Sequence, residues 1–206
     1  MGNASDDETL MLAYRGGDAR AFEVLYARHK DPLYRYLLRQ CRVAAVAEEL
    51  FQDVWMKLIR ARERYEVRAK FTTYLYRLAH NRLIDYYRSQ SARVPISYDE
   101  DPEEPIIEQI EDTTTREPSN ALNTQRQAKQ LLGLIAQLPE AQREAFLLRE
   151  EAGLSLEEIA HTTGTNVETA KSRLRYAVTK LRSGMRQPVD DPRVARTQQR
   201  AGEEGS

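Results

Sequence analysis

The sequence predicts an all-α protein of two small helical domains joined by a flexible acidic linker, with a helix-turn-helix in the second domain. Apolar residues recur at three- and four-residue spacing in both halves, as on the buried face of a helix. No stretch shows the alternation of a strand or the turn of a hairpin. A proline- and acid-rich segment between the halves cannot bury enough apolar surface to fold alone. We therefore expect a first domain at 1–92, a linker at 93–119, a second domain at 120–186 and a disordered tail at 187–206.

The composition points to a cytoplasmic protein. The 206 residues include 31 Lys and Arg against 32 Asp and Glu, and no apolar run approaches the roughly 20 residues that span a bilayer. Residues 1–8 are acidic and lack the apolar core of a signal peptide. Cys41 is the only cysteine, which excludes an internal disulfide and a cysteine-based zinc site. We expect no membrane contact, no metal and no cofactor.

Charge is segregated along the chain, although the net charge is only −1. From Lys57 to Arg93 there are ten bases and three acids, and from Val94 to Pro118 nine acids and one base. From Lys171 to Arg186 there are six bases and no acid. Two basic blocks around an acidic spacer indicate a polyanionic partner such as nucleic acid.

The first domain begins with a short helix that Gly16 and Gly17 should end, and Asp18 is a suitable N-cap for the next helix. Pro32 should kink or split that second helix. A third helix buries Leu50 and the apolar residues at helical spacing after it. Its other face carries Glu48, Glu49, Gln52, Asp53 and Met56. On sequence alone this acidic face is either solvated surface or a docking face for a protein.

Tyrosines are interleaved with bases from Arg60 to Arg88. On a helical wheel one stripe collects Lys70, Tyr74, Arg77, Asn81 and Arg88, and the opposite arc is apolar apart from Arg82. Aromatic rings beside cations suit single-stranded nucleic acid, because bases stack on the rings while phosphates meet the cations. The alternative is that the tyrosines belong to the core.

The second domain contains the signature of a helix-turn-helix. Ser155 and Glu158 form a capping-box pattern that starts a short helix, and Gly164 precedes a long amphipathic one. The polar face of the long helix carries Glu168, Lys171, Ser172, Arg175, Thr179 and Arg182, which suits a major groove. Thr165 and Glu168 also fit a capping box, so the alternative to a base contact by Glu168 is that it caps the helix. A helical hairpin with a solvated basic face is the alternative for the whole domain.

An enzyme is not expected. His29, His80 and His161 lie far apart in sequence with no triad or metal-ligand spacing, and no glycine-rich loop could cradle a phosphate.

The motifs together resemble those of bacterial extracytoplasmic-function sigma factors. The segment 47–55, AEELFQDVW, resembles the helix that binds core RNA polymerase in that family, and 71–85, FTTYLYRLAHNRLID, resembles its −10-recognition helix. LPE at 138–140, LEEIA at 156–160 and AKSRL at 170–174 resemble its −35-recognition module. Two departures are Tyr74, where the family usually has Trp, and Glu168-Thr169-Ala170, which replaces the common Gly-Thr-Val.

The resemblance implies a promoter-specificity subunit whose partners are core RNA polymerase, promoter DNA and, as in many relatives, an anti-sigma factor. It assigns −35 binding to Lys171, Ser172, Arg173, Arg175, Thr179 and Arg182. It assigns −10 binding to Arg62, Arg64, Tyr65, Lys70, Phe71, Tyr74, Arg77, Asn81 and Arg88. It assigns polymerase binding to Glu48, Glu49, Gln52, Asp53 and Met56, which would dock on a coiled coil of the largest subunit.

A second reading is a helix-turn-helix regulator whose first domain is a sensor. A sensor needs a ligand cavity or a dimer seam and gains nothing from a tyrosine and arginine stripe. The linker length is compatible with the first reading. One and a half turns of DNA measure about 50 Å, and the 27 residues of 93–119 reach at most about 90 Å when extended.

Overall fold

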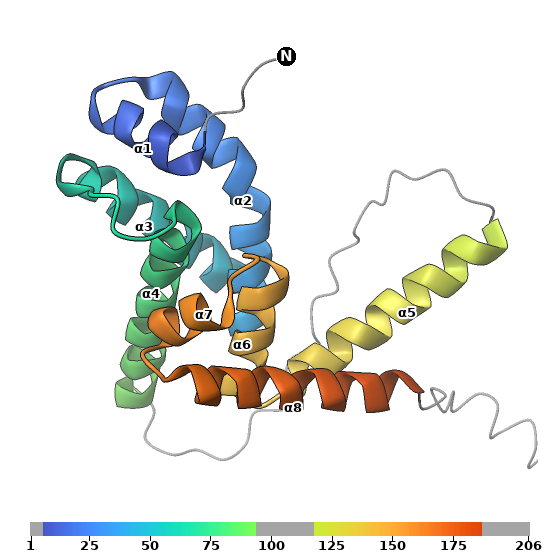
Figure 1. The fold of residues 1–206 in the computed structure, drawn as a ribbon. Coiled ribbons are helices and arrows are strands. Elements are labelled where there is room, and N and C mark those ends of the chain that lie inside the picture. Colours follow the sequence, from blue (N-terminus) through green and yellow to red (C-terminus); the bar gives the residue numbers. More distant parts are fainter. Residues whose placement is uncertain (1–5, 94–117, 187–206) are drawn as a thin grey trace, which may run out of the picture.

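The computed structural model describes residues 6–93 and 118–186, and within them it contains α helices, one 3-10 turn and no strand (Figure 1). The predicted all-α fold is therefore confirmed. Residues 94–117 of the expected linker and the expected tail at 187–206 lie outside the described residues. None of the described helices is both long and apolar enough to cross a membrane.

The first module consists of α1 (Asp7–Arg15), α2 (Ala19–Cys41), α3 (Ala44–Ala61), the 3-10 turn η1 (Arg62–Arg64) and α4 (Phe71–Arg93). The turn between α1 and α2 follows the prediction. Gly17 has a φ of 104°, a left-handed conformation that favours glycine. The Asp18 carboxylate then accepts a hydrogen bond from the amide of Arg20 at 3.0 Å and caps α2.

Pro32 does not split α2, which runs as one helix from Ala19 to Cys41, so of the predicted kink or split the split is wrong. A proline inside a helix costs about 3 kcal/mol, because it removes one hydrogen bond and crowds the preceding turn. Apolar burial on both sides of Pro32 offsets that cost: Leu25, Leu33 and Leu37 of α2 are completely buried. Tertiary packing therefore decides the conformation at this position.

Helices α2, α3 and α4 pack around one apolar core. Leu50, Val54 and Leu58 of α3 are completely buried, as the helical spacing predicted. Tyr36 of α2 and Tyr76 of α4 meet edge to face with ring centroids 5.2 Å apart. This packing fixes α4 along the side of the module and leaves its polar stripe outside.

The second module consists of α5 (Pro118–Ala136), α6 (Glu140–Glu150), α7 (Leu156–Thr163) and α8 (Val167–Arg186). The long α8 lies across α6, α7 and the end of α5 (Figure 1). Its Ala170, Ala177 and Leu181 are buried, and Gly184 lets α8 approach Leu134 of α5. A Cβ added to Gly184 would lie 2.4 Å from a methyl carbon of Leu134.

The two modules pack against each other, with α7 beside α4 and α6 beside α2 (Figure 1). The buried Arg143 of α6 donates to the side-chain oxygen of Gln40 of α2 at 3.2 Å, across the boundary. Polar and charged side chains make up much of this contact, as in interfaces between domains that move relative to one another.

Candidate nucleic-acid interface

Helices α7 and α8 meet at a turn that their sequence specifies. The amide of Glu158 donates to Ser155 Oγ at 3.2 Å, and the amide of Ser155 donates to the Glu158 carboxylate at 2.8 Å. The predicted capping box is therefore confirmed. Gly164 ends α7 with a φ of 65°, so the chain turns sharply into the next helix.

Helix α8 begins at a cap that the sequence analysis did not identify. Asn166 Oδ1 accepts a hydrogen bond from the amide of Thr169 at 2.7 Å. The alternative capping box between Thr165 and Glu168 is therefore wrong. The Glu168 side chain is exposed and lies 3.8 Å from the ammonium of Lys171, one turn further on.

The outer face of α8 is open along its length. Lys171, Arg175, Thr179 and Arg182 are exposed, and Ser172 is half-buried. Thr179 Oγ1 donates back to the carbonyl of Arg175 at 2.9 Å, which leaves the threonine methyl as the group available to a thymine methyl. A helix with an exposed cationic face of this kind can enter a major groove.

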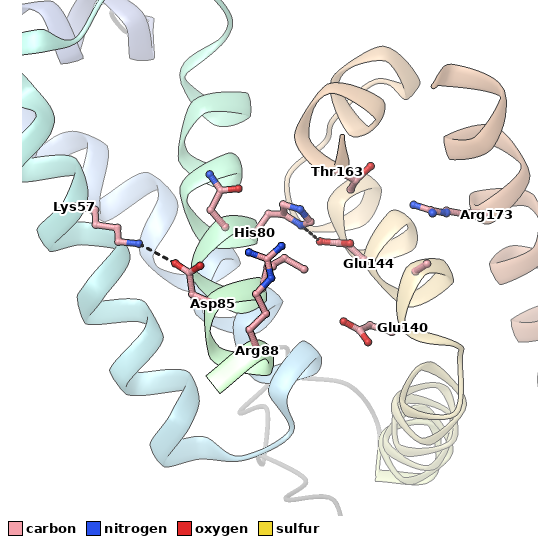
Figure 2. A pocket seen from close by; sticks show the side chains of 11 residues that line it. Lys57, His80, Asp85, Arg88, Glu140, Glu144, Thr163 and Arg173 are labelled. Carbon is pink, nitrogen blue, oxygen red and sulfur yellow. Dashed lines mark hydrogen bonds and ion pairs between the residues drawn. The ribbon is translucent and has the colours of Figure 1, made fainter. Parts of the chain in front are cut away.

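Arg173 does not belong to this outer face. It is half-buried and lines a cleft of about 830 Å³ between the two modules, together with His80, Asn81 and Arg88 of α4 (Figure 2). In this arrangement Arg173 faces the cleft, whereas Arg175 is on the outer face, and the −35 assignment of Arg173 stays a prediction. Arg173 follows Lys171 by two residues, which is a rotation of about 200° around the helix, so the two side chains lie on nearly opposite sides.

Tyr176 is a candidate that the sequence analysis missed. Its side chain is 55% exposed, and the guanidinium carbon of Arg175 lies 5.2 Å from the ring centroid. On the helix it stands four residues after Ser172 and three before Thr179. That spacing, available from the sequence, was enough to place it on the outer face.

Tyr74 is half-buried on α4 and presents its ring at the edge of a cavity. The ring lies edge-on to Tyr65 with centroids 5.3 Å apart. The cavity has a volume of about 570 Å³, and its lining includes Arg64, Tyr74, Arg77 and His161. Cavities of roughly 300–1,000 Å³ hold drug-sized ligands, so an unstacked nucleobase would fit.

Two of the rings assigned to −10 binding lie in the core instead. Phe71 is fully buried and Tyr65 is 4% exposed, so neither ring offers a face to a base in this structure. Burial raises the pKa of Tyr65 to about 12, and the carboxylate of Glu8 adds to this shift. Tyr65 packs edge-on against Tyr74 and, with it, lines the cavity. Both are core residues here, and their assignment to direct −10 contact stays a prediction.

The remaining −10 candidates are at the surface, but the second module covers part of them. Lys70, Arg77, Asn81 and Arg88 are exposed and Arg62 is half-buried. The ammonium of Lys70 pairs with Glu158 at 3.1 Å, and Arg77 lies 3.3 Å from His161 Nε2. Arg62 places its guanidinium 5.5 Å from the ring centroid of Tyr14.

The acidic face of α3 is exposed, but it is partly paired within the module. Met56 is 45% exposed, and Glu48, Glu49 and Gln52 are also at the surface. Arg82 Nε donates to Asp53 at 2.7 Å, and a terminal nitrogen of Arg82 donates to Glu49 at 3.3 Å. This accounts for the arginine in the apolar arc of α4: its head reaches the carboxylates of α3.

Aromatic residues extend this face onto α2, which the sequence analysis also missed. Tyr26 is 36% exposed, with its ring centroid 5.0 Å from that of Trp55 and 6.2 Å from that of Phe51. Exposed aromatic side chains are enriched at protein interfaces. No cluster of three or more potential metal ligands occurs among the described residues.

Comparison with known proteins identifies the family. Residues 25–93 match Sigma-70 region 2, and residues 128–181 match Sigma-70 region 4. RNA polymerase sigma factor CarQ of Myxococcus xanthus is 33% identical over 84% of this chain and 93% of its own length. The ECF RNA polymerase sigma-E factor of Escherichia coli (strain K12) is 30% identical over 82% of this chain and 88% of that protein.

The chain belongs to the extracytoplasmic-function group of RNA polymerase sigma factors. This sigma factor is a transcription initiation factor and not an enzyme. Its first module matches a sigma region, which overturns the reading of that module as a sensor. The fold is similar to that of sigma factor RpoE from Bartonella quintana, solved in complex with the anti-sigma factor NepR. The TM-score is 0.61 at 21% identity, and the match covers 84% of this chain and 99% of that one.

Proposed function

We propose that the sigma factor reads the −35 duplex with α8 and holds an unpaired base of the −10 strand against Tyr74. The observation that carries this is the placing of Tyr74, whose ring borders a base-sized cavity that is also lined by Arg64 and Arg77. Stacking a base on an aromatic side chain contributes roughly 1–3 kcal/mol. Binding the opened strand and not the duplex shifts the equilibrium towards melting, without nucleotide hydrolysis by this chain.

We assign the protein partner to a surface that the DNA does not use. The exposed part of the α3 face, Glu48, Gln52 and Met56, is where we propose that core polymerase docks. Charged residues at the edge of such a surface steer the approaching partner, and apolar residues are buried when the complex forms. Because core polymerase is its partner, we place the sigma factor in the cytoplasm. An anti-sigma factor is a further proposed partner, since the similar sigma factor RpoE of Bartonella quintana has been solved in such a complex.

The test is transcription in vitro with core polymerase and a promoter library, comparing Tyr74→Ala with the unchanged chain. We expect Tyr74→Ala to lower open-complex formation by about 5- to 150-fold, the equivalent of one lost stacking contact. Permanganate footprinting of unpaired thymines measures the opened strand, and anisotropy measures binding of a −35 duplex. The duplex affinity of the isolated sigma factor should not change.

Tyr74→Phe is the matched control, because it keeps the ring and loses only the hydroxyl. Promoter opening should remain close to that of the unchanged chain. Circular dichroism melts show whether either variant loses structure, since Tyr74 also packs on Tyr65. Full opening by a folded Tyr74→Ala variant would contradict the proposed role.

A further inference from the structure

Carboxylates of the second module meet cations and hydrogen-bond donors of the first module along their common boundary. Glu158 pairs with Lys70. Glu144 accepts from the hydroxyl of Tyr36 at 3.2 Å and lies 2.5 Å from His80 Nδ1 (Figure 2). Glu151, one residue beyond α6, is the third carboxylate at this boundary. The acids therefore cover the side of the first module that carries the proposed −10 surface.

The Glu151 carboxylate is held by two arginines. Arg35 Nε lies 2.9 Å from one carboxylate oxygen, and a terminal nitrogen of Arg39 donates to the other. The two arginines are four residues apart on α2, so their side chains lie one above the other on the same face. The Glu151 side chain is only 7% exposed. Two guanidinium groups that donate hydrogen bonds to both oxygens of a carboxylate can bind the oxygens of a phosphate in the same way.

Within residues 6–93 and 118–186, neither arginine has another anionic partner. Among the described residues the only ion pairs of Arg35 and Arg39 are those with Glu151. If the modules separate, the two guanidinium groups lose their counter-charge together. Arg35 lies near α4, because the next residue of α2, Tyr36, packs its ring on that of Tyr76 with centroids 5.2 Å apart. The next residue of α4 is Arg77, which lines the cavity at Tyr74.

We propose that Arg35 and Arg39 form a DNA phosphate site that Glu151 occupies while the two modules are packed together. The site extends the single-strand surface of the first module beyond Arg77, so this inference rests on the proposed function. Simultaneous binding to two promoter elements about 50 Å apart requires the modules to separate, because here they are in contact. Separation withdraws Glu151, and a phosphate of the captured strand replaces it.

The experiment measures binding of the full chain, without polymerase, to a fluorescein-labelled single-stranded DNA of 20 mixed nucleotides over a salt series. Glu151→Gln should bind about 3- to 10-fold more tightly than the unchanged chain. Its plot of log affinity against log salt should be steeper by about 0.7, because the site adds one phosphate contact and each contact adds about 0.7 on a single strand. Arg35→Ala and Arg39→Ala, introduced together into Glu151→Gln, should abolish both gains.

Glu150→Gln is the matched control. Glu150 is exposed, directly precedes Glu151 and takes part in no ion pair among the described residues, so the variant loses the same charge without freeing the arginines. Equal binding by Glu150→Gln and Glu151→Gln would overturn the proposal, as would a gain that survives loss of both arginines. A gain for core polymerase and not for DNA would assign the pair to an acidic protein surface instead, and would overturn it too.

The outcome is separable from that of the proposed function. Promoter opening by Tyr74→Ala tests base capture with polymerase present, whereas oligonucleotide binding tests the arginine pair without it. Normal opening by Tyr74→Ala together with tighter DNA binding by Glu151→Gln would refute base capture and retain the phosphate site. Circular dichroism melts of all variants confirm that the compared chains are folded.

Discussion

Arg175 and Tyr176 are neighbours in sequence that hold each other in place on the outer face of α8. The guanidinium carbon lies 5.2 Å from the ring centroid, and the ring itself is 55% exposed. An exposed cation–π contact contributes about 0.5–1 kcal/mol, enough to bias the arginine rotamer before DNA arrives. A guanidinium already positioned loses less entropy when it donates two hydrogen bonds to guanine.

Arg175→Ala should therefore lower discrimination at one −35 position by about 1–3 kcal/mol, if the contact to guanine is bidentate. The measurement is anisotropy with a −35 duplex selected from a random library, and with single-base variants of that duplex. Arg126→Ala is the control, because Arg126 is exposed on α5 and outside the α8 face. A loss of affinity that is uniform across all duplexes would show a phosphate contact instead of a base contact.

At the scale of an element, the capping box makes α7 sensitive to acid. Burial alone would raise the pKa of Glu158, but hydrogen bonds from the Ser155 amide and the Lys70 ammonium outweigh it, so the pKa lies below the ordinary 4.5. A carboxyl with a depressed pKa in the folded state stabilises above its unfolded pKa, and this contribution is lost as pH falls through the folded value.

Glu158→Gln should accordingly flatten the acid limb of stability below about pH 5, because glutamine keeps the acceptor oxygen but does not titrate. Melting temperatures by circular dichroism from pH 3 to pH 6 measure the effect. Glu150→Gln, an exposed change away from the cap, should leave the slope as it is in the unchanged chain. Equal slopes for Glu158→Gln and the unchanged chain would mean that the cap contributes no pH dependence.

Elements whose determinants are local could be predicted from the sequence, and those that depend on distant contacts could not. The cap at Ser155 and the turn at Gly17 involve residues five or fewer positions apart. The split predicted at Pro32 does not occur, because burial of α2 against the rest of the module outweighs the local cost. Tyr65 was placed at the surface because nothing in its neighbourhood shows that its carbonyl accepts from Arg15, 50 residues earlier.

At the scale of the whole molecule, the sequence indicated candidate contact residues but not how the two modules meet. The pair between Arg35 and Glu151 joins residues 116 positions apart, and that between His80 and Glu144 joins residues 64 apart. Each partner looks like an ordinary surface charge on its own helix. Arg173 was grouped with Arg175 for the same reason, although it turns towards the cleft between the modules. Only the packing of both modules shows these relations.

The length of the chain between the modules should limit which promoters can be used. Helix α4 ends at Arg93 and α5 begins at Pro118, so residues 94–117 join the modules. Removing 14 of these 24 residues leaves 10, which reach at most about 35 Å at roughly 3.5 Å per residue, less than the roughly 50 Å between the two elements. Transcription in vitro should fall by at least tenfold, while binding of a −35 duplex should persist because α8 is unchanged. Replacing the 14 residues with glycine and serine should restore reach and much of the activity. Full activity of the shortened chain would show that the modules engage the two elements without spanning that distance.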